Sequence, residues 1–207
     1  MDKILTLIIG KSSNLSIALD KSIPNAILIS SLSISKELDN IKYVQYDSIN
    51  IIFNQFQQST KLNSLDNPIE YIQRSIVSTT QVLSYFKDKE IQIKKIIYTS
   101  SSSVYGNNTS CNEKDDINPQ SLHSSLKLAN EQLIKKFSID NNINYTIARV
   151  FNMYGGNDNF SIVSKITNIY KNKSVLNLIN NGEAIRDFIY IDDVVYIYKK
   201  LLFENSC

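Results

Sequence analysis

One segment in the middle of the chain constrains the fold more than any other. It begins as an apolar, β-branched run and ends abruptly in hydroxyl groups and a glycine, Ile96-Ile97-Tyr98-Thr99-Ser100-Ser101-Ser102-Ser103-Val104-Tyr105-Gly106. Such a run is typical of a buried parallel strand whose carboxyl end opens into a polar site. Because open α/β sheets bind ligands at the carboxyl ends of their strands, the segment predicts where a site lies.

Strand and helix patterns alternate along the chain. We expect strands at 4–9, 26–30, 42–45, 50–54, 94–99 and 144–150, and helices near 14–20, 67–87, 120–139, 157–171 and 192–204. This alternation predicts an α/β fold, a doubly wound parallel sheet of the Rossmann type with right-handed crossovers. The 207 residues suffice for one domain with a full hydrophobic core.

Composition and charge exclude several classes of protein. A net charge of +2, with both signs interspersed, gives no indication of a nucleic-acid partner. Cys111 and Cys207 have neither metal spacing nor a disulfide framework, and one histidine with two cysteines cannot build a zinc site unaided. The apolar start is too short for a membrane span and is interrupted at Gly10. We therefore expect a cytoplasmic protein without a metal and without membrane contact.

Two further segments make the pattern specific, Arg149-Val150-Phe151-Asn152-Met153-Tyr154-Gly155 and Gly182-Glu183-Ala184-Ile185-Arg186-Asp187-Phe188-Ile189-Tyr190-Ile191-Asp192-Asp193-Val194-Val195. With the serine-rich strand, in this order and spacing, they resemble the extended short-chain dehydrogenase/reductase family of nucleotide-sugar epimerases, dehydratases and reductases. The resemblance covers nearly the whole chain. It implies NAD or NADP as the cofactor, a nucleotide sugar as the substrate, and a role in polysaccharide biosynthesis.

The cofactor side of the resemblance is eroded. Gly10-Lys11-Ser12-Ser13-Asn14-Leu15-Ser16 stands in the place of the family's G-x-x-G-x-x-G. The resemblance therefore implies that the pyrophosphate lies at Gly10, Ser12, Ser13 and Ser16. Ser30 stands where an acidic residue holds the ribose in NAD enzymes, and Asp47 resembles an aspartate near the adenine. Because only the first glycine is kept, we expect a weakened dinucleotide site.

The catalytic side departs from the family at one position. Pro119-Gln120-Ser121-Leu122-His123-Ser124-Ser125-Leu126-Lys127 matches P-x-S-x-Y-x-x-x-K except that His123 replaces the tyrosine. The resemblance implies that Ser101, with Ser100 or Ser102 as near alternatives, bonds the substrate oxygen. It implies that Lys127 lowers the proton-transfer group's pKa and holds the ribose. His123 either replaces the tyrosine, titrating near neutral pH, or marks a lost or weakened proton transfer; both interpretations stay open.

The substrate side is better kept. The resemblance implies that Tyr105, Asn152 and Arg186 face the nucleotide sugar, with Arg186 pairing with its diphosphate. The alternatives are a structural role for Tyr105 and a surface salt bridge for Arg186. For Arg149, at the end of a strand, a structural ion pair is the favoured interpretation.

We expect a single NAD(P)-binding domain over residues 1–207, with a partial substrate-binding region from about residue 152. Family members usually continue with a further core strand and a carboxyl-terminal region, so the chain is either a fragment or a minimal form that another chain completes. The helices near 67–87 and 120–139 form the family's dimer interface, which predicts a homodimer. Two functions stay open: an NAD(P)-dependent epimerase, dehydratase or reductase, and an impaired member that binds a nucleotide sugar or a partner subunit without turnover.

Overall fold

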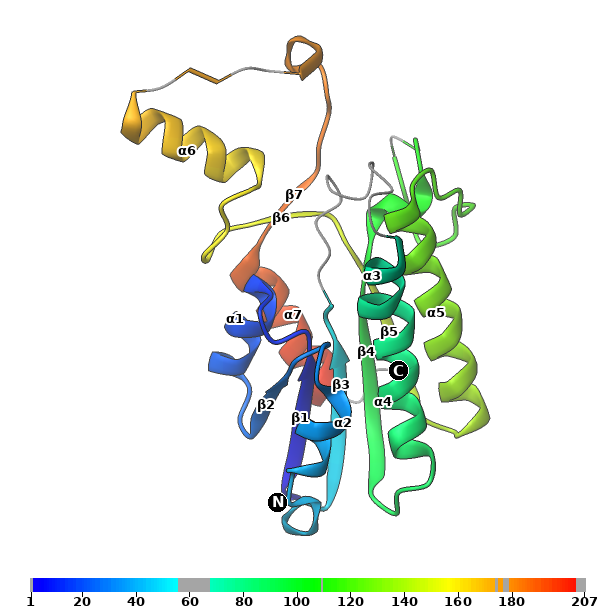
Figure 1. The fold of residues 1–207 in the computed structure, drawn as a ribbon. Coiled ribbons are helices and arrows are strands. Elements are labelled where there is room, and N and C mark those ends of the chain that lie inside the picture. Colours follow the sequence, from blue (N-terminus) through cyan, green and yellow to red (C-terminus); the bar gives the residue numbers. More distant parts are fainter. Residues whose placement is uncertain (1, 56–67, 109, 174, 177–178, 204–207) are drawn as a thin grey trace.

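A five-stranded parallel sheet forms the centre of the computed structural model, which describes residues 2–55, 68–108, 110–173, 175–176 and 179–203 (Figure 1). Its strand order is β2-β1-β3-β4-β5. The strands are β1 (Ile4–Ile9), β2 (Ala26–Ile29), β3 (Ser48–Phe53), β4 (Gln92–Ser101) and β5 (Asn144–Val150). The parallel, doubly wound sheet expected from the sequence is confirmed.

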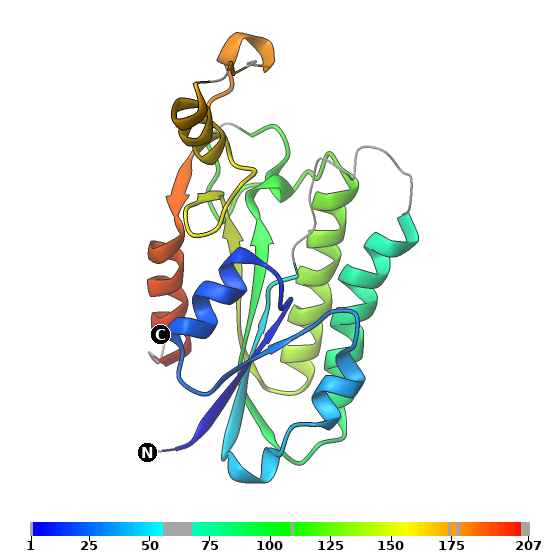
Figure 2. The same ribbon diagram turned by 60° about the vertical axis from the view of Figure 1, so that its left-hand side comes forward.

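Helices cover both faces of the sheet (Figures 1 and 2). On one face lie α1 (Asn14–Ser22) and α7 (Ile191–Phe203), and on the other lie α2 (Ile34–Asp39), α3 (Pro68–Ile72), α4 (Ser78–Lys87) and α5 (Leu122–Asp140). Successive residues of a strand point to opposite faces, so Ile8 and Ile9 enter different hydrophobic clusters. Both are fully buried, which explains why the strands read as continuous apolar runs.

The predicted helix near 67–87 is described from Pro68 onward and contains an irregular turn. A π-helical segment, Gln73–Val77, joins α3 to α4. There Ser75 accepts a 2.7 Å hydrogen bond from the side chain of Asn130 in α5. The two long helices therefore lie against each other on the same side of the sheet, as the sequence predicted.

A smaller parallel pair lies beyond the carboxyl edge of the main sheet. It consists of β6 (Asn152–Tyr154) and β7 (Phe188–Tyr190), with α6 (Ile162–Asn172) and a 3₁₀ turn at Ile179–Gly182 between them in the chain. Helix α6 begins later than the predicted residue 157 because Ser161 caps it, accepting from the amide of Ser164. Within the described ranges, no helix combines the length and the apolar character needed to cross a membrane.

The strand predicted at 42–45 is wrong. Residues Tyr43–Gln45 form a 3₁₀ turn, and the Tyr43 ring packs edge-on against Phe86 with centroids 5.7 Å apart. Its hydroxyl donates to the carbonyl of Leu38 at 3.1 Å. The aromatic and β-branched residues here serve packing rather than strand pairing. As a result β2 ends the described sheet, where the usual Rossmann order, 3-2-1-4-5-6, places one more strand beyond it.

Candidate active site

Most of the predicted site residues lie along one edge of the sheet. Gly10 follows β1, Asn54 and Gln55 follow β3, and Ser101 ends β4. Helix α5 begins beside this edge, and it carries His123 and Lys127 in its first two turns. Parallel strands expose unpaired backbone groups and their last side chains at this edge, so the arrangement is suited to ligand binding.

Gly10 is required by the shape of its turn. Its φ is +110°, and a Cβ at this position would lie 2.4 Å from the carbonyl oxygen of Asn54. The turn leads into α1, whose first amides have no carbonyl of the helix to bond. The backbone at Gly10 and at the start of α1 can therefore approach a phosphate closely.

The two serines that replace glycines face inward. Ser13 caps α1 by accepting from the amide of Ser16 at 3.0 Å, and the two hydroxyls lie 3.0 Å apart. The side-chain nitrogen of Asn54 donates to both, at 2.6 Å to Ser13 and 2.9 Å to Ser16. All three side chains are buried, so they fill the space that glycines would leave. Ser12, in contrast, is exposed on the outside of the turn.

A carboxylate that the sequence did not indicate lies at the end of β2. Glu37 accepts from the backbone amide of Ser30 at 3.1 Å and from the hydroxyl of Ser33 at 2.5 Å. Both oxygens of Glu37 are thus engaged by the turn that follows β2. Ser30 occupies the position expected for ribose binding, and its own hydroxyl accepts from the amide of Leu32.

The placement of Asp47 near the adenine is wrong. Asp47 precedes β3 instead of ending a strand, because the segment before it forms a 3₁₀ turn. Its carboxylate accepts from the amide of Lys3 at 2.7 Å, and its own amide donates to the Lys3 carbonyl at 3.0 Å. It therefore lies at the amino-terminal edge of β1 and β3, opposite to Gly10.

Lys127 lies where β3 and β4 end. Its ammonium group donates to the carbonyl of Thr99 at 2.8 Å and to the carbonyl of Gln55 at 3.3 Å. It also lies 5.1 Å from the centre of the Tyr98 ring. Burial lowers the pKa of Lys127 to about 8, against the opposing effect of the Glu131 carboxylate. The amine is thus mostly charged at neutral pH, but it releases its proton more readily than an exposed lysine.

His123 has one long contact in the site. Its Nδ1 lies 3.5 Å from the hydroxyl of Ser103, while the Ser101 hydroxyl accepts from the amide of Ser103 at 3.2 Å. Burial, and then the charge of Lys127, lower the pKa of His123 to about 4. The ring is therefore neutral at physiological pH. Burial and the charge of Lys127 thus oppose a titration near neutral pH, and the replacement of the tyrosine by His123 stays a prediction.

A buried ion pair supports the serine-rich strand from behind. Glu131 binds Arg149 at 2.8 Å and 3.1 Å, and it accepts a short hydrogen bond from Ser100. Arg149 in turn donates to the hydroxyl of Tyr105 at 2.9 Å. The structural ion pair expected for Arg149 is confirmed. Tyr105 is only 4% exposed, so the geometry favours its structural alternative.

The two remaining substrate-side residues lie beyond the main sheet. The side chain of Asn152 donates to the carbonyl of Asp187 at 2.8 Å, which fixes β6 against β7. Arg186 is exposed, and its guanidinium donates to the carbonyl of Ile185 at 3.1 Å. The salt-bridge alternative for Arg186 is not seen: the ion pairs among the described residues involve other arginines and lysines.

Asn14 connects the two parts of the site. Its side-chain nitrogen donates to the carbonyl of Gly155 at 2.8 Å, and its oxygen accepts from the amide of Asn157 at 2.9 Å. Helix α1 is thereby tied to the loop that follows β6. The turn after Gly10 and the loop that follows β6 are therefore held at a fixed separation.

This geometry can be compared with known proteins. A model of the NAD dependent epimerase/dehydratase family matches residues 12–206. The chain belongs to this family. Protein CapI of Staphylococcus aureus is 32% identical over 187 residues, which cover 82% of this chain and 55% of that protein. UDP-glucuronate 4-epimerase 3 of Arabidopsis thaliana is 33% identical over 139 residues, which cover 64% of this chain and 32% of that protein. The chain thus spans about half the length, or less, of these curated relatives.

Solved structures of similar proteins share the fold. UDP-glucuronic acid 4-epimerase from Bacillus cereus, in complex with UDP-glucuronic acid and NAD, has a TM-score of 0.77 at 20% identity. That match covers 98% of this chain and 74% of the other. UDP-N-acetylglucosamine 4-epimerase from Methanobrevibacter ruminantium M1 has a TM-score of 0.75 at 21% identity, covering 95% and 72%. These likenesses concern the course of the backbone and not the side chains of the site.

Several residues of the site escaped the family pattern. Asn54 is one of them: it matches no motif of the family, yet it donates to both inward-facing serines. Ser103, Glu37 and Asn14 were not identified at all. A family pattern carries no signal for residues that differ from it, and their contacts depend on the packed structure.

Proposed function

We propose that the protein binds an NAD-type dinucleotide across the carboxyl edge of its sheet and acts on a nucleotide sugar. The reaction would be epimerisation, dehydration or reduction, the classes proposed from the sequence. The observation that carries the proposal is Lys127, a partly buried ammonium group held by Thr99 and Gln55 where two strands end. Family membership supports the reaction class, and the Bacillus cereus structure of the same fold is a complex with UDP-glucuronic acid and NAD.

The residues at this edge fit a dinucleotide. At Gly10 the chain makes a tight turn against the Asn54 carbonyl that any side chain would prevent, and it leads into α1, whose first amides have no carbonyl of the helix to bond. The side-chain oxygen of Gln55 is buried without a hydrogen-bond partner among the described residues, and a ribose hydroxyl would supply one. The inward hydroxyls of Ser13 and Ser16 leave the phosphate to backbone amides alone. We therefore propose a weakened site for NAD or NADP.

The remaining roles in the reaction fall to residues of the chain. When bound, the dinucleotide supplies hydride transfer. Ser101 ends β4 and orients the reacting hydroxyl of the sugar, while the charge of Lys127 favours loss of that proton. His123 accepts the proton as a neutral imidazole. Because its pKa is about 4, it is a weak base, and we expect slow turnover.

The second candidate is a member that binds a nucleotide sugar or a partner subunit without turnover. The weak basicity of His123 and its 3.5 Å contact with Ser103 favour it. In that case Asn152 and Arg186 would hold the diphosphate while the proton-transfer step is absent. Exposed Arg186 is free to swing toward such a ligand.

Assembly and location belong to the same proposal. Large apolar side chains are exposed on α3 and the π segment, namely Ile69, Ile72 and Val77, and Ile139 is exposed near the carboxyl end of α5. Exposed apolar groups on adjacent helices support a homodimer through this surface. We place the protein in the cytoplasm, where NAD and nucleotide sugars are available. Sedimentation should show a dimer that Ile69→Lys dissociates and Ile185→Lys, at another exposed isoleucine, does not; a wild-type monomer contradicts it.

Calorimetric titration of the purified chain with NAD⁺ and NADP⁺ tests the cofactor site. Lys127→Met should weaken binding at least tenfold, on the order of one charge-assisted hydrogen bond. Lys135→Met, at an exposed lysine of the same helix, is the matched control. If neither dinucleotide binds, or if both variants bind like the wild type, the cofactor site is refuted.

Turnover separates the two candidates. With UDP-glucuronic acid and UDP-glucose as probes, the enzyme reading predicts slow conversion that His123→Tyr accelerates and His123→Ala abolishes. If the dinucleotide and the sugar nucleotide bind but neither the wild type nor His123→Tyr converts them, the binding-only candidate is the correct one.

A further inference from the structure

In the part of the chain that the structure describes, no strand pairs with the outer side of β2. Strand β2 is the outermost strand of the described sheet, with β1 on its inner side. The chain between β2 and β3, residues 30–47, is described throughout, and it forms α2 and a 3₁₀ turn rather than another strand. The strand that the usual Rossmann order places outside β2 is therefore not supplied by this part of the chain.

The inner hydrogen bonds of β2 show which groups face β1. The carbonyl of Asn25 accepts from the amide of Thr6 at 3.0 Å, and the carbonyl of Ile29 accepts from the amide of Gly10 at 2.9 Å. Backbone groups alternate in direction along a strand, so the odd-numbered residues face inward.

The even-numbered residues consequently face outward. Their backbone groups belong to Ala26, Leu28 and Ser30. The amide of Ser30 meets the carboxylate of Glu37 at 3.1 Å, which confirms this direction. At Ala26 and Leu28 the edge offers donors and acceptors in the spacing that a further strand would match.

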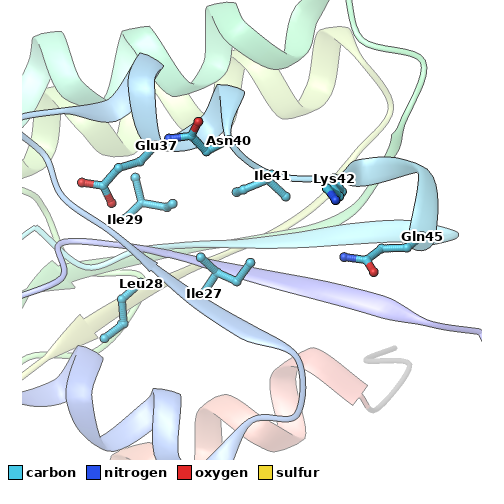
Figure 3. A pocket seen from close by; sticks show the side chains of 8 residues that line it. All are labelled: Ile27, Leu28, Ile29, Glu37, Asn40, Ile41, Lys42 and Gln45. Atoms are coloured by element: carbon cyan, nitrogen blue, oxygen red, sulfur yellow. The ribbon is translucent and has the colours of Figure 1, made fainter.

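A groove of about 400 Å³ runs along this edge (Figure 3). It is lined by Ile27, Leu28, Ile29, Glu37, Asn40, Ile41, Lys42 and Gln45. Figure 3 shows Glu37 beside the carboxyl end of β2 and Lys42 beside its amino end. The groove is thus apolar along the strand and carries opposite charges at its two ends.

This charge pattern selects the occupant. We infer that the edge binds the same edge of a second copy of the chain, with the two β2 strands antiparallel about a two-fold axis at Leu28. An antiparallel copy reverses the direction of the groove. Glu37 of each copy then faces Lys42 of the other, and the pattern is self-complementary.

The pairing uses groups that are otherwise exposed to water. Leu28 faces Leu28 of the second copy and exchanges two backbone hydrogen bonds with it. Ser30 does not extend the pairing, because its amide donates to Glu37 and its carbonyl accepts from the amide of Ser33. The contact is short, because β2 has only four residues. We therefore expect a weak dimer, formed at higher concentrations than a standard interface requires. This inference does not depend on the proposed enzymatic function.

Sedimentation velocity of the purified chain, from about 10 µM to about 500 µM, tests the pairing in the range where weak dimers form. The measurements use the Ile69→Lys variant, which removes the proposed association through α3 and the π segment. Any remaining association then reports on the β2 edge. Lys42→Glu should weaken the dimer about tenfold, because two attractive pairs become repulsive. Lys36→Glu, an equal charge change on an exposed residue of α2 that does not line the groove, should leave it unchanged.

A charge exchange gives the sharper result. Combining Glu37→Lys with Lys42→Glu should restore the dimer that Lys42→Glu weakens. If Glu37→Lys disturbs the turn after β2, amide hydrogen exchange takes the place of the charge-exchange experiment. In the Ile69→Lys background, exchange of the Leu28 amide should slow as the protein concentration rises. A monomer at every concentration, equal effects of Lys42→Glu and Lys36→Glu, or Leu28 exchange independent of concentration would overturn the inference. So would a dimer that forms only after an extended peptide is added.

Discussion

The turn after β1 and the place where the start of α5 meets the turn after β4 both depart from the family pattern, but they differ in how the departure is accommodated. In the first, Ser13, Ser16 and Asn54 bond one another at 2.6–3.0 Å and are buried. In the second, His123 has a 3.5 Å contact with Ser103 and a strongly lowered pKa.

The difference shows that polar residues that replace those of the family pattern can either hydrogen-bond to one another or stand without such partners. Residues that hydrogen-bond to one another satisfy their own donors and acceptors, so removing one of them leaves the others without partners. An isolated residue is free to change with little structural cost, and its effect falls on chemistry. Substitutions in the turn after β1 should therefore change the free energy of unfolding, and substitutions at His123 should chiefly change turnover.

The largest effect is expected at the residue on which the first turn is built. Gly10→Ala should lower the free energy of unfolding by about 3 kcal/mol, because its Cβ meets the Asn54 carbonyl and its φ is positive. Urea unfolding measures this change. Ser12→Ala, at an exposed position of the same turn, is the control and should stay within about 0.5 kcal/mol. Equal values for both variants would refute the steric argument.

The second-largest effect on stability is expected for the hydrogen-bonded group of Ser13, Ser16 and Asn54. Replacing Ser13 and Ser16 together by glycine, which the sequence pattern favours for binding, should destabilise the protein by about 2 to 3 kcal/mol. The reason is that Asn54 loses both acceptors and α1 loses its cap. Adding Asn54→Ala should recover about 1 kcal/mol, as coupled residues do in double-mutant cycles. Strictly additive costs in urea unfolding would show that the three side chains are independent. Dinucleotide binding should be tighter in the triple variant than in the wild type.

Acid should lower the stability of the protein through His123. The pKa of His123 is about 4 in the folded protein and about 6.5 when unfolded, so the unfolded chain binds more protons between these values. Stability associated with this residue is complete above pH 6.5 and is lost as the pH falls to 4. Between pH 7 and pH 4.5, the wild type should lose about 2 kcal/mol more than His123→Gln. Parallel losses in the two proteins would mean that the ring is not buried.

The smallest effect compares one hydroxyl from each turn. Ser13→Ala removes a helix cap and should cost about 1 kcal/mol, whereas Ser103→Ala removes only a long contact and should cost less than about 0.5 kcal/mol. Both are measured by urea unfolding at pH 7. A larger cost at Ser103 would reverse the comparison.

The sequence predicted the main strands well because burial on both faces requires continuous apolar runs. This held for β1, β3 and the second part of β4. It failed at 42–45, where similar residues pack against Phe86 and form no strand. Helix α2 was missed because six residues give too short a pattern.

The site was predicted in part, for a related reason. Motif spacing along α5 located His123 and Lys127 one turn apart, since helical neighbours follow from sequence. The partners of Ser13 and Lys127 come from other strands, and no local pattern encodes them. Asp47 was misplaced because its role depended on a strand that does not form.

The two hydrogen bonds of Asn14 bear on how family members can be recombined. A natural place to exchange modules is near residue 152, where the main sheet ends and β6 begins. Asn14 nevertheless bonds the backbone on either side of Gly156, far along the chain. A chimaera that takes its carboxyl-terminal module from another member should therefore inherit that member's residue at position 14 as well, although this residue lies in the opposite module.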